Sequence, residues 1–233
     1  MRGRGRRSSA KQRWRGGESR LTEAMLEDAL LYAIADTGYC APRDLPAAAA
    51  QMVAGGADVI QLRAKDLAAD EIAALGRALL ALTRPAGVPL IINDHPEIAA
   101  LIGADGVHVG QDDRAVAEAR AVVGSGAIIG KSTHSLAQAA AGAAEDVAYI
   151  GFGPLFATPT KPDYAPIGTG DIAEAHRLIA KPIFCIGGIK RENLADVIAC
   201  GAQRAVIVSG ILQAADVAAY CRECRAMLAE RRG

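Results

Sequence analysis

Residues 59–93, with the sequence VIQLRAKDLAADEIAALGRALLALTRPAGVPLIIN, contain one complete strand–helix–strand unit. Val59–Arg63 and Leu90–Ile92 are short, largely apolar runs of the kind that forms buried β-strands. Between them, Leu67–Leu82 is rich in Ala and Leu and has helical character. Two strands joined through a helix are typical of parallel neighbours in a sheet, so this unit predicts an α/β fold.

The same alternation extends in both directions to cover the chain from residue 29 onward. Eight strands with apolar residues on both faces indicate a parallel sheet covered by helices, and a count of eight favours closure into a single (β/α)8 TIM barrel. The predicted strands are Leu30–Ala35, Val59–Arg63, Leu90–Ile92, Gly106–Val109, Ile128–Gly130, Val147–Gly151, Ile183–Ile186 and Ala205–Val208. The helical segments between and after them include Leu67–Leu82, Arg114–Val123, Leu136–Ala144, Asp171–Ile179, Arg191–Cys200 and Asp216–Ala229.

Charge is distributed unevenly along the 233 residues, although the formal net charge is zero. Residues 1–20 hold eight Lys or Arg and one acidic residue, which leaves 18 basic against 25 acidic residues in the remainder, a net charge of −7. We expect residues 1–24 to be a disordered basic extension and residues 25–233 to form the barrel domain. A solvated tail or a start codon placed before Met25 explains the extension; an RNA contact and a transit peptide are the alternatives. The acidic body argues against specific nucleic-acid binding.

Five scattered cysteines with no secretory signal before them predict a reducing, cytoplasmic location. No apolar stretch approaches the roughly 18 residues that a membrane span needs. Cys221 and Cys224 form a C-x-x-C pair, but structural zinc usually needs four ligands and no second pair or histidine lies nearby. Partners are therefore expected to be small molecules, and a homo-oligomer is compatible with the sequence.

The cluster QLRAK places three polar residues at the end of one predicted strand. Because side chains alternate along a strand, Gln61, Arg63 and Lys65 point to one face, while Leu62 and Ala64 point to the other. Two cations that face the barrel axis are costly to bury without an anion, which indicates a bound phosphate or pyrophosphate. The alternative is an ion pair with an inward acid on a neighbouring strand.

Two further strand ends, in IINDH and VHVGQDD, supply carboxylates. Asn93 or Asp94, and Asp112 or Asp113, have the positions of helix N-caps, and each taken singly fits capping as well as metal binding. Taken together, hard oxygen ligands from adjacent strand ends suit Mg²⁺, which typically uses one or two carboxylates with phosphate oxygens and water. His108, inside a strand, is interpreted as a packed histidine.

Two hydroxyl-rich segments follow the fifth and sixth strands. GKSTHS carries Ser132 and His134, with Ser135 as the expected N-cap of the next helix. GPLFATPTK offers Thr158, Thr160 and Lys161 on a long loop, 154–170, whose length favours a functional or mobile segment. Hydroxyls with one lysine are typical of anion recognition.

Glycines follow the seventh and eighth strands in CIGGIK and IVSGI. Barrels often build a phosphate site from backbone N–H groups at this position. Ordinary turn glycines are the alternative explanation. If the glycines do bind an anion, it is a second phosphate, distinct from the one near Arg63 and Lys65.

The series QLRxK, ND, HVGQDD, the Ser-Thr-His turn, GPxFxTxTK, IGGI and VSGI, in this order and spacing, resembles the thiamine-phosphate synthase family over roughly residues 30–212. Members are (β/α)8 barrels that join hydroxymethylpyrimidine diphosphate to a thiazole phosphate, releasing pyrophosphate and giving thiamine monophosphate. The resemblance therefore implies a transferase of thiamine biosynthesis with Mg²⁺ as its cofactor.

The resemblance also implies roles for individual residues. Asp94 and Asp113 would bind Mg²⁺, while Arg63, Lys65, Ser132 and Lys161 would act on the departing pyrophosphate. The substrate-binding residues that it implies are Gln61, Arg63, Lys65, Asn93, Ser132 and Lys161 for the pyrimidine diphosphate, and Thr158, Thr160, Gly188, Val208 and Ser209 for the thiazole phosphate.

Two positions depart from the family pattern: Lys131 stands where an apolar residue is expected, and Ala64 where an acid is expected. Ala64 should face the helices, so its effect is expected to be benign, whereas Lys131 adds a cation to the mouth if it points inward. Two alternative functions are weighed. A thiazole tautomerase of the same family would use His134 without the metal set, and a non-catalytic phosphate-binding barrel would use the basic tail as its contact.

Overall fold

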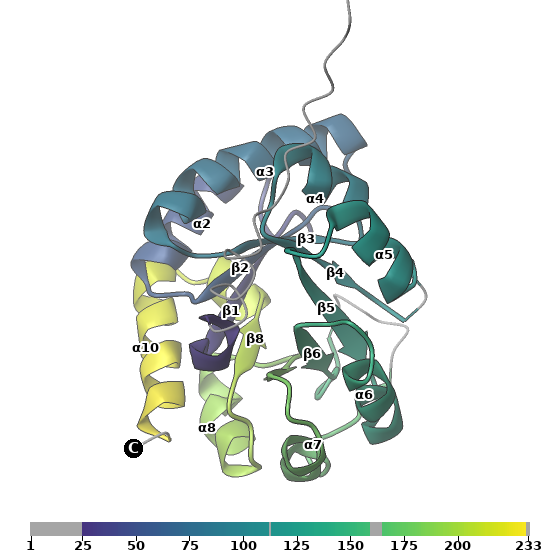
Figure 1. Cartoon of the computed structure of the whole chain (residues 1–233). Helices are drawn as coiled ribbons and strands as arrows, with labels where there is room; N and C mark the ends of the chain where they lie inside the picture. Colours follow the sequence, from purple (N-terminus) through teal and green to yellow (C-terminus); the bar gives the residue numbers. More distant parts are fainter. Residues whose placement is uncertain (1–24, 112, 159–164, 232–233) are drawn as a thin grey trace, which may run out of the picture.

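Eight parallel strands close into a barrel in chain order in the computed structural model, which describes residues 25–111, 113–158 and 165–231 (Figure 1). Strand β8 returns to β1 with the register Leu31↔Ala205 and Ala33↔Ile207. This topology confirms the predicted (β/α)8 barrel. The strands are β1 (Leu31–Asp36), β2 (Val59–Arg63), β3 (Leu90–Asn93), β4 (Gly106–Val109), β5 (Ile128–Thr133), β6 (Tyr149–Phe152), β7 (Ile183–Cys185) and β8 (Ala205–Ile207).

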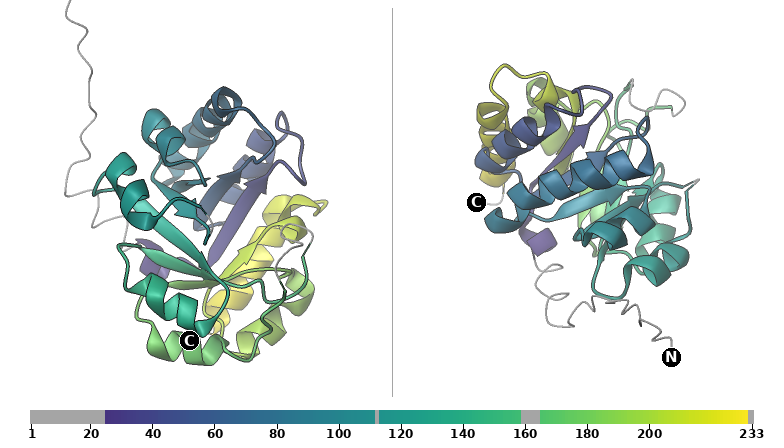
Figure 2. Two further views of the ribbon diagram at one scale, coloured as in Figure 1. Left: turned by 90° about the vertical axis from the view of Figure 1, so that its right-hand side faces the viewer. Right: turned by 90° about the horizontal axis from the view of Figure 1, so that it is seen from above.

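Helices form an outer layer around this barrel (Figure 2). Helix α3 begins where the Glu71 carboxylate accepts the Ala68 N–H at 2.9 Å, and Asp70 adds negative charge at the same helix end. The helices are α2 (Leu45–Ala54), α3 (Ala69–Thr83), η1 (Arg84–Ala86), α4 (Pro96–Ile102), α5 (Val116–Val123), α6 (Leu136–Ala143), α7 (Ile172–Leu178), α8 (Arg191–Ala199), α9 (Ser209–Leu212) and α10 (Val217–Glu230).

Alternation along the strands separates two apolar clusters. On β2, Val59 belongs to the cluster inside the barrel, while Ile60 and Leu62 belong to the larger cluster between strands and helices. Ala64 lies in this outer cluster, as expected from its place in QLRAK. The inner cluster is closed at one end by Leu26, which is 1% exposed and precedes the first strand. The strand period therefore assigns residues to the helix layer or to the barrel axis.

Three aromatic rings occupy the inside of the barrel. Tyr32, Tyr149 and Phe184 meet edge to face with ring centroids 5.4–5.6 Å apart. The inward position Gly130 makes room for them, since a Cβ there would overlap the Tyr149 ring. Edge-to-face pairs of this kind add about 0.5–1.5 kcal/mol each to the stabilisation from burial. These rings form a solid floor beneath the carboxyl ends of the strands.

The N-cap residues of the helices agree with only part of the capping predictions. Ser135 caps α6, where its side chain accepts the Gln138 N–H at 3.2 Å, as predicted. By contrast, α4 and α5 have His95 and Ala115 at their N-cap positions, so Asn93, Asp94 and Asp113 do not serve as caps. Asp112 and the predicted extension, residues 1–24, lie outside the described residues.

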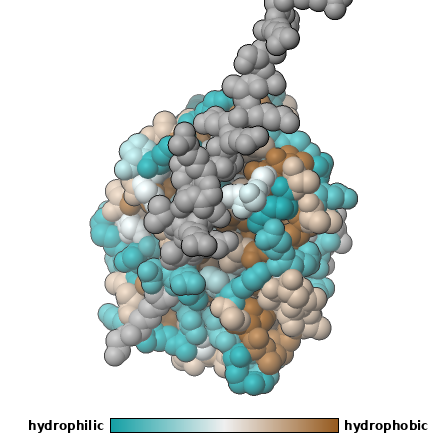
Figure 3. Space-filling model, in the orientation of Figure 1, coloured by the Kyte–Doolittle hydropathy of each residue, from teal (hydrophilic) through white to brown (hydrophobic). Residues whose placement is uncertain are grey.

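The described surface is mixed in character. Teal and brown residues are interspersed on the face shown in Figure 3. The large apolar side chains that are exposed, Met25, Leu101 and Leu178, belong to separate elements. Among the described helices, none has the length and apolar character needed to cross a membrane.

Candidate active site

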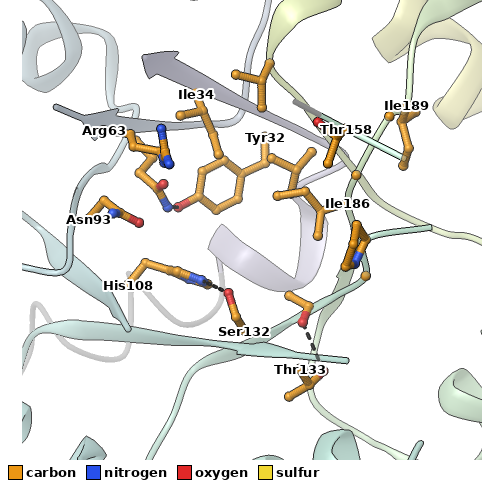
Figure 4. Close-up of a pocket in the computed structure, with 18 of the residues that line it drawn as sticks. Tyr32, Ile34, Arg63, Asn93, His108, Ser132, Thr133, Thr158, Ile186 and Ile189 are labelled. Carbon is orange, nitrogen blue, oxygen red and sulfur yellow. Dashed lines mark hydrogen bonds between the residues drawn. The ribbon is translucent and has the colours of Figure 1, made fainter. Parts of the chain in front are cut away.

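A pocket opens at the carboxyl ends of the strands, above the aromatic floor (Figure 4). Its walls come from the ends of β1 to β8 and from the loops that follow β6, β7 and β8. Strand ends at this face of a barrel are where ligands bind in proteins of this fold. The lining includes eight of the residues singled out from the sequence: Gln61, Arg63, Asn93, Ser132, Thr158, Gly188, Val208 and Ser209.

The remaining predicted residues lie beside the pocket or outside the description. Lys65, Asp94 and Asp113 are not part of the lining, although Lys65 Nζ lies 3.3 Å from Asp94 Oδ2. Thr160 and Lys161 fall in the segment 159–164, outside the described residues. The structure therefore gathers eight of the predicted residues around one pocket, while Lys65, Asp94 and Asp113 lie outside its lining.

Arg63 is held by a buried carboxylate at the mouth of the barrel. Its Nη1 donates to Asp36 Oδ2 at 2.9 Å, and the Asp36 side chain is 1% exposed. The ion pair with an inward acid on a neighbouring strand, weighed as an alternative to a bound anion, is thus present. Arg63 also lines the pocket, and a guanidinium has five donors, so an ion pair with Asp36 and a contact with an anion are compatible.

Asp94 and Asp113 bring two carboxyl groups together next to Lys65. Burial first, and then the hydrogen bond to and charge of Asp113, raise the pKa of Asp94, while Lys65 acts in the opposite direction. Asp94 has a φ of 62°, a left-handed conformation that is uncommon for any residue other than glycine. Asp113 is fixed in turn, because its Oδ2 accepts the Gly110 N–H at 2.7 Å.

This carboxylate pair tests whether a cation fits. A carboxyl group whose pKa is raised by burial and by a neighbouring carboxyl group belongs to a donor set that a divalent cation would satisfy. Among the described residues, no group of three or more His, Cys, Asp or Glu side chains could hold a metal ion. Mg²⁺ fits a donor set of this kind, because it typically uses one or two carboxylates together with phosphate oxygens and water.

A continuous series of hydrogen bonds crosses the floor of the pocket. Gln61 Nε2 donates to Tyr32 Oη at 2.8 Å, and the Tyr32 and Tyr149 hydroxyls lie 2.8 Å apart. His108 then joins Tyr149 Oη at 3.0 Å through Nδ1 and Ser132 Oγ at 2.8 Å through Nε2. Burial raises the pKa of both tyrosines, so both phenols stay neutral at ordinary pH.

Sequence reasoning missed Tyr32 and Tyr149 and treated His108 as a packing residue. The missed signal was the strand period, which puts Tyr32 on the inward side of β1 and His108 and Tyr149 on the inward sides of β4 and β6. Polar aromatic residues at inward positions need hydrogen-bond partners, and these three provide them for one another.

Two contacts hold Ser132 and His134 in the pocket wall. The Gln111 side-chain amide donates to the Ser132 carbonyl, and His134 Nδ1 contacts the Gly153 carbonyl. Lys131 lies between the two inward residues of β5 and pairs outward with Glu145, next to α6. The added cation is therefore directed to the helix layer and not to the mouth.

The glycines after β7 have a structural reason of their own. Gly187 and Gly188 have φ values of 98° and 67°, and a Cβ at either would clash with the loop after β6, at Pro154 or Phe156. These contacts bring the two loops together at the pocket rim. The turn explanation therefore accounts for both glycines, and a phosphate contact through their backbone remains compatible with it.

Comparisons with known proteins agree with this geometry. A family model described as "Thiamine monophosphate synthase" matches residues 31–211. The thiamine-phosphate synthase of Chloroflexus aurantiacus is 41% identical over 206 residues, covering 88% of this chain and 95% of the relative. The enzyme of that name from Thermus thermophilus is 45% identical over 177 residues, or 76% and 85% of the two chains.

The likeness extends to a solved structure. A thiamine phosphate pyrophosphorylase from Pyrococcus furiosus superposes with a TM-score of 0.82 at 27% identity, covering 90% of this chain and all of that one. The matched region spans every strand of the barrel and the pocket at their carboxyl ends. The chain belongs to the thiamine monophosphate synthase family.

Proposed function

We infer that this transferase, a thiamine-phosphate synthase, condenses hydroxymethylpyrimidine diphosphate with thiazole phosphate to give thiamine monophosphate and pyrophosphate. The observation that carries the proposal is that a family match over residues 31–211 coincides with one pocket lined by eight of the predicted substrate residues. Donors suited to a diphosphate, such as Arg63, and backbone suited to a second phosphate, at Gly188 and Ser209, line this same pocket. A substrate pair of this kind would fit both.

The proposed chemistry begins when the carbon–oxygen bond of the pyrimidine diphosphate breaks. This step leaves a pyrimidine methyl cation, stabilised by the electron-rich amino-substituted ring, and a pyrophosphate anion. Arg63, Lys65, Lys161 and Ser132 would bind the pyrophosphate oxygens and offset the charge that develops on them. The thiazole nitrogen then forms the new carbon–nitrogen bond, so neither a covalent nucleophile nor a general base is required.

Mg²⁺ is the proposed cofactor, with Asp94 and Asp113 as its protein ligands. When bound, it would supply a positive charge that neutralises the pyrophosphate oxygens. Asn93 would hold the pyrimidine diphosphate beside it. Thr158, Thr160, Gly188, Val208 and Ser209 would hold the thiazole phosphate, through hydroxyls and backbone N–H groups.

A cytoplasmic location is also proposed. All five cysteines are free, and three of them, Cys185, Cys221 and Cys224, are buried. Burial raises the pKa of each of these three thiols to about 12, so they are unreactive packing residues. This pattern suits a reducing compartment.

A product assay tests the function directly. Purified protein is mixed with both substrates, in Mg²⁺ or in EDTA, and thiamine monophosphate and pyrophosphate are quantified. We expect equal amounts of the two products with Mg²⁺ and almost none with EDTA. Folded protein that forms neither product with Mg²⁺ would contradict the proposal and turn attention to tautomerisation of a thiazole phosphate with His134 as the acting residue.

A further inference from the structure

The hydrogen-bond series across the pocket floor links two groups that face the ligand. It runs from Gln61 through Tyr32, Tyr149 and His108 to Ser132, and both end residues line the pocket. Figure 4 shows the bond between His108 and Ser132 at one end of the series. Tyr32 and Tyr149 are each 1% exposed, and the ring of His108 stacks on that of Tyr149 with centroids 5.6 Å apart. Bulk water therefore has little access to the two tyrosines in the middle of the series.

Each inner member has only one hydrogen to donate along the series. A tyrosine hydroxyl carries one proton, and a neutral imidazole carries one proton on two ring nitrogens. Within the described residues, Tyr32 Oη has two hydrogen-bond partners, Gln61 and Tyr149. Fixing the direction of any one bond thus fixes the direction of all the others, since a reversal in the middle would leave a buried hydrogen without an acceptor.

Two directions satisfy every inner group. In the first, Gln61 donates to Tyr32, Tyr32 to Tyr149, Tyr149 to His108 Nδ1, and His108 Nε2–H to Ser132, whose own hydrogen is then left for the pocket. In the second, all bonds reverse, so that Ser132 donates to His108 and Gln61 accepts from Tyr32 through a flipped amide. The observed Gln61 orientation, with Nε2 at Tyr32, is the first direction.

We propose that this series is a polarity relay, meaning that all its members donate their hydrogens in the same direction. Tyr149 and His108 are then positioning residues, which make Gln61 a hydrogen-bond acceptor and Ser132 a hydrogen-bond donor toward the ligand. The proposal rests on the function above, whose substrate carries both an amino group and a diphosphate. An amino group needs an acceptor, and a phosphate oxygen needs a donor. The first direction presents the Gln61 acceptor to the amino group and the Ser132 donor to the phosphate. The second direction presents the wrong kind of group at both ends of the series.

The relay predicts the protonation site of His108, which NMR can measure without any turnover. In the full-length protein labelled with ¹⁵N-histidine, long-range ¹H–¹⁵N correlations distinguish the two tautomers at about pH 8, well above the usual imidazole pKa. We expect a single Nε2–H tautomer at His108, assigned by the signals lost in His108→Gln. An Nδ1–H tautomer, or a doubly protonated ring, would overturn the proposal.

Binding measurements test the coupling between the two ends. The ligands are the pyrimidine diphosphate and its analogue with hydrogen in place of the amino group, titrated calorimetrically. We expect the wild-type protein to prefer the amino compound by at least about tenfold, or 1.4 kcal/mol, and Tyr149→Phe to lose most of this preference. Tyr220→Phe removes a hydroxyl that bonds the Arg191 N–H far from this series, and it should keep the preference.

The outcomes separate the relay from the function on which it rests. Wild-type protein that makes no product but shows the Nε2–H tautomer would contradict the function and leave the relay geometry intact. Active wild-type protein with an unchanged ligand preference in Tyr149→Phe would contradict the relay alone. If Tyr149→Phe fails to fold, Tyr32→Phe breaks the same series at the next bond, and it should give the same loss of preference.

Discussion

Asp36 illustrates how one buried side chain can control a functional one. Its Oδ1 accepts the Gly38 N–H at 2.9 Å, and its Oδ2 holds Arg63, so the carboxylate is fixed before it orients the guanidinium. An arginine fixed in this way loses less side-chain entropy when it binds an anion. Asp36 directly follows the first predicted strand, Leu30–Ala35, and the sequence alone could not identify Arg63 as its partner.

Replacing this acid should weaken substrate use. Asp36→Asn keeps the shape but leaves Arg63 without its charged partner, so we expect kcat/KM for the pyrimidine diphosphate to fall by roughly tenfold to a hundredfold. Steady-state kinetics measures this change. Asp58→Asn is the matched control: it removes the same charge from an ion pair with Arg225, whose guanidinium lies 3.0 Å away, at the opposite end of the barrel. An equal loss in both variants would indicate a general effect on folding.

The carboxylate pair makes a second prediction at the level of single residues. Asp94→Ala should lower turnover at least about tenfold, corresponding to about 1.4 kcal/mol, because the proposed Mg²⁺ site would keep only one carboxylate ligand. The effect should also appear as a higher Mg²⁺ concentration at half-maximal rate. Asp196→Ala, on the exposed face of α8, should change neither value. Near-normal turnover in Asp94→Ala would contradict the proposed role of Asp94 as a Mg²⁺ ligand.

At the scale of the element, β5 separates two kinds of polar residue by its period of two. Ser132 faces the pocket, whereas Lys131 faces the helix layer and pairs with Glu145. Gly130, two residues before Ser132, faces the same way and leaves the space that Tyr149 fills. Three consecutive residues on one strand therefore have unrelated roles.

Lys131 should have little influence on catalysis. Lys131→Gln removes the ion pair with Glu145, and it should lower the free energy of unfolding by no more than about 1 kcal/mol. Turnover and the KM for both substrates should stay within twofold of wild type, as measured in the product assay. A large rise in either KM would show that this side chain contributes charge to the mouth.

Gly130→Ala, unlike Lys131→Gln, should lower both the stability of the protein and its catalytic activity. The new Cβ would overlap the Tyr149 ring, and the crowding should cost about 1–3 kcal/mol in the free energy of unfolding, measured with urea. Because Tyr149 would shift with respect to His108, catalysis should fall as well. The control is Gly124→Ala, where a Cβ has open space but φ is 87°, so that stability should fall while kcat/KM is retained. Unaltered kcat/KM in Gly130→Ala would show that the floor tolerates displacement.

At the scale of the whole molecule, one histidine remote from the pocket should influence acid stability. Burial first, and then the charges of Arg204 and Arg231, lower the pKa of His176 to about 4, and within the described residues its Nε2 has no hydrogen-bond partner. The unfolded chain protonates near pH 6.5. Between these two values the unfolded state binds the extra proton, so stability is lost as the pH falls from about 6.5 toward 4.

His176→Gln should remove part of this pH dependence. Between pH 7 and pH 4.5 we expect the wild type to lose more unfolding free energy than the variant, by on the order of 1–2 kcal/mol after allowing for partial exposure. Urea unfolding at the two pH values gives the comparison. His95→Gln, at an exposed position, should behave as wild type. Equal losses in all three proteins would contradict the assignment to His176.

The fold class, the eight strand positions to within a few residues, and the clusters at the strand ends could all be predicted from the sequence. These features depend on local patterns: alternation along strands, glycine and proline between elements, and polar residues where apolar runs stop. The predicted site residues at the strand ends, such as Gln61, Asn93 and Ser132, lie around one pocket. This is because the parallel strands of a closed barrel place all their carboxyl ends at the same mouth.

Which side chains contact one another could be seen only in the folded structure. It paired Arg63 with Asp36, turned Lys131 toward Glu145, and placed the Asp94 carboxyl against Asp113 through a left-handed backbone. It also joined Tyr32, Tyr149 and His108 into one series. The longest of these contacts depend on closure of the barrel and not on a local sequence pattern, because they join distant strands: Asp36 and Arg63 are 27 residues apart, and Tyr32 and Tyr149 are 117 apart.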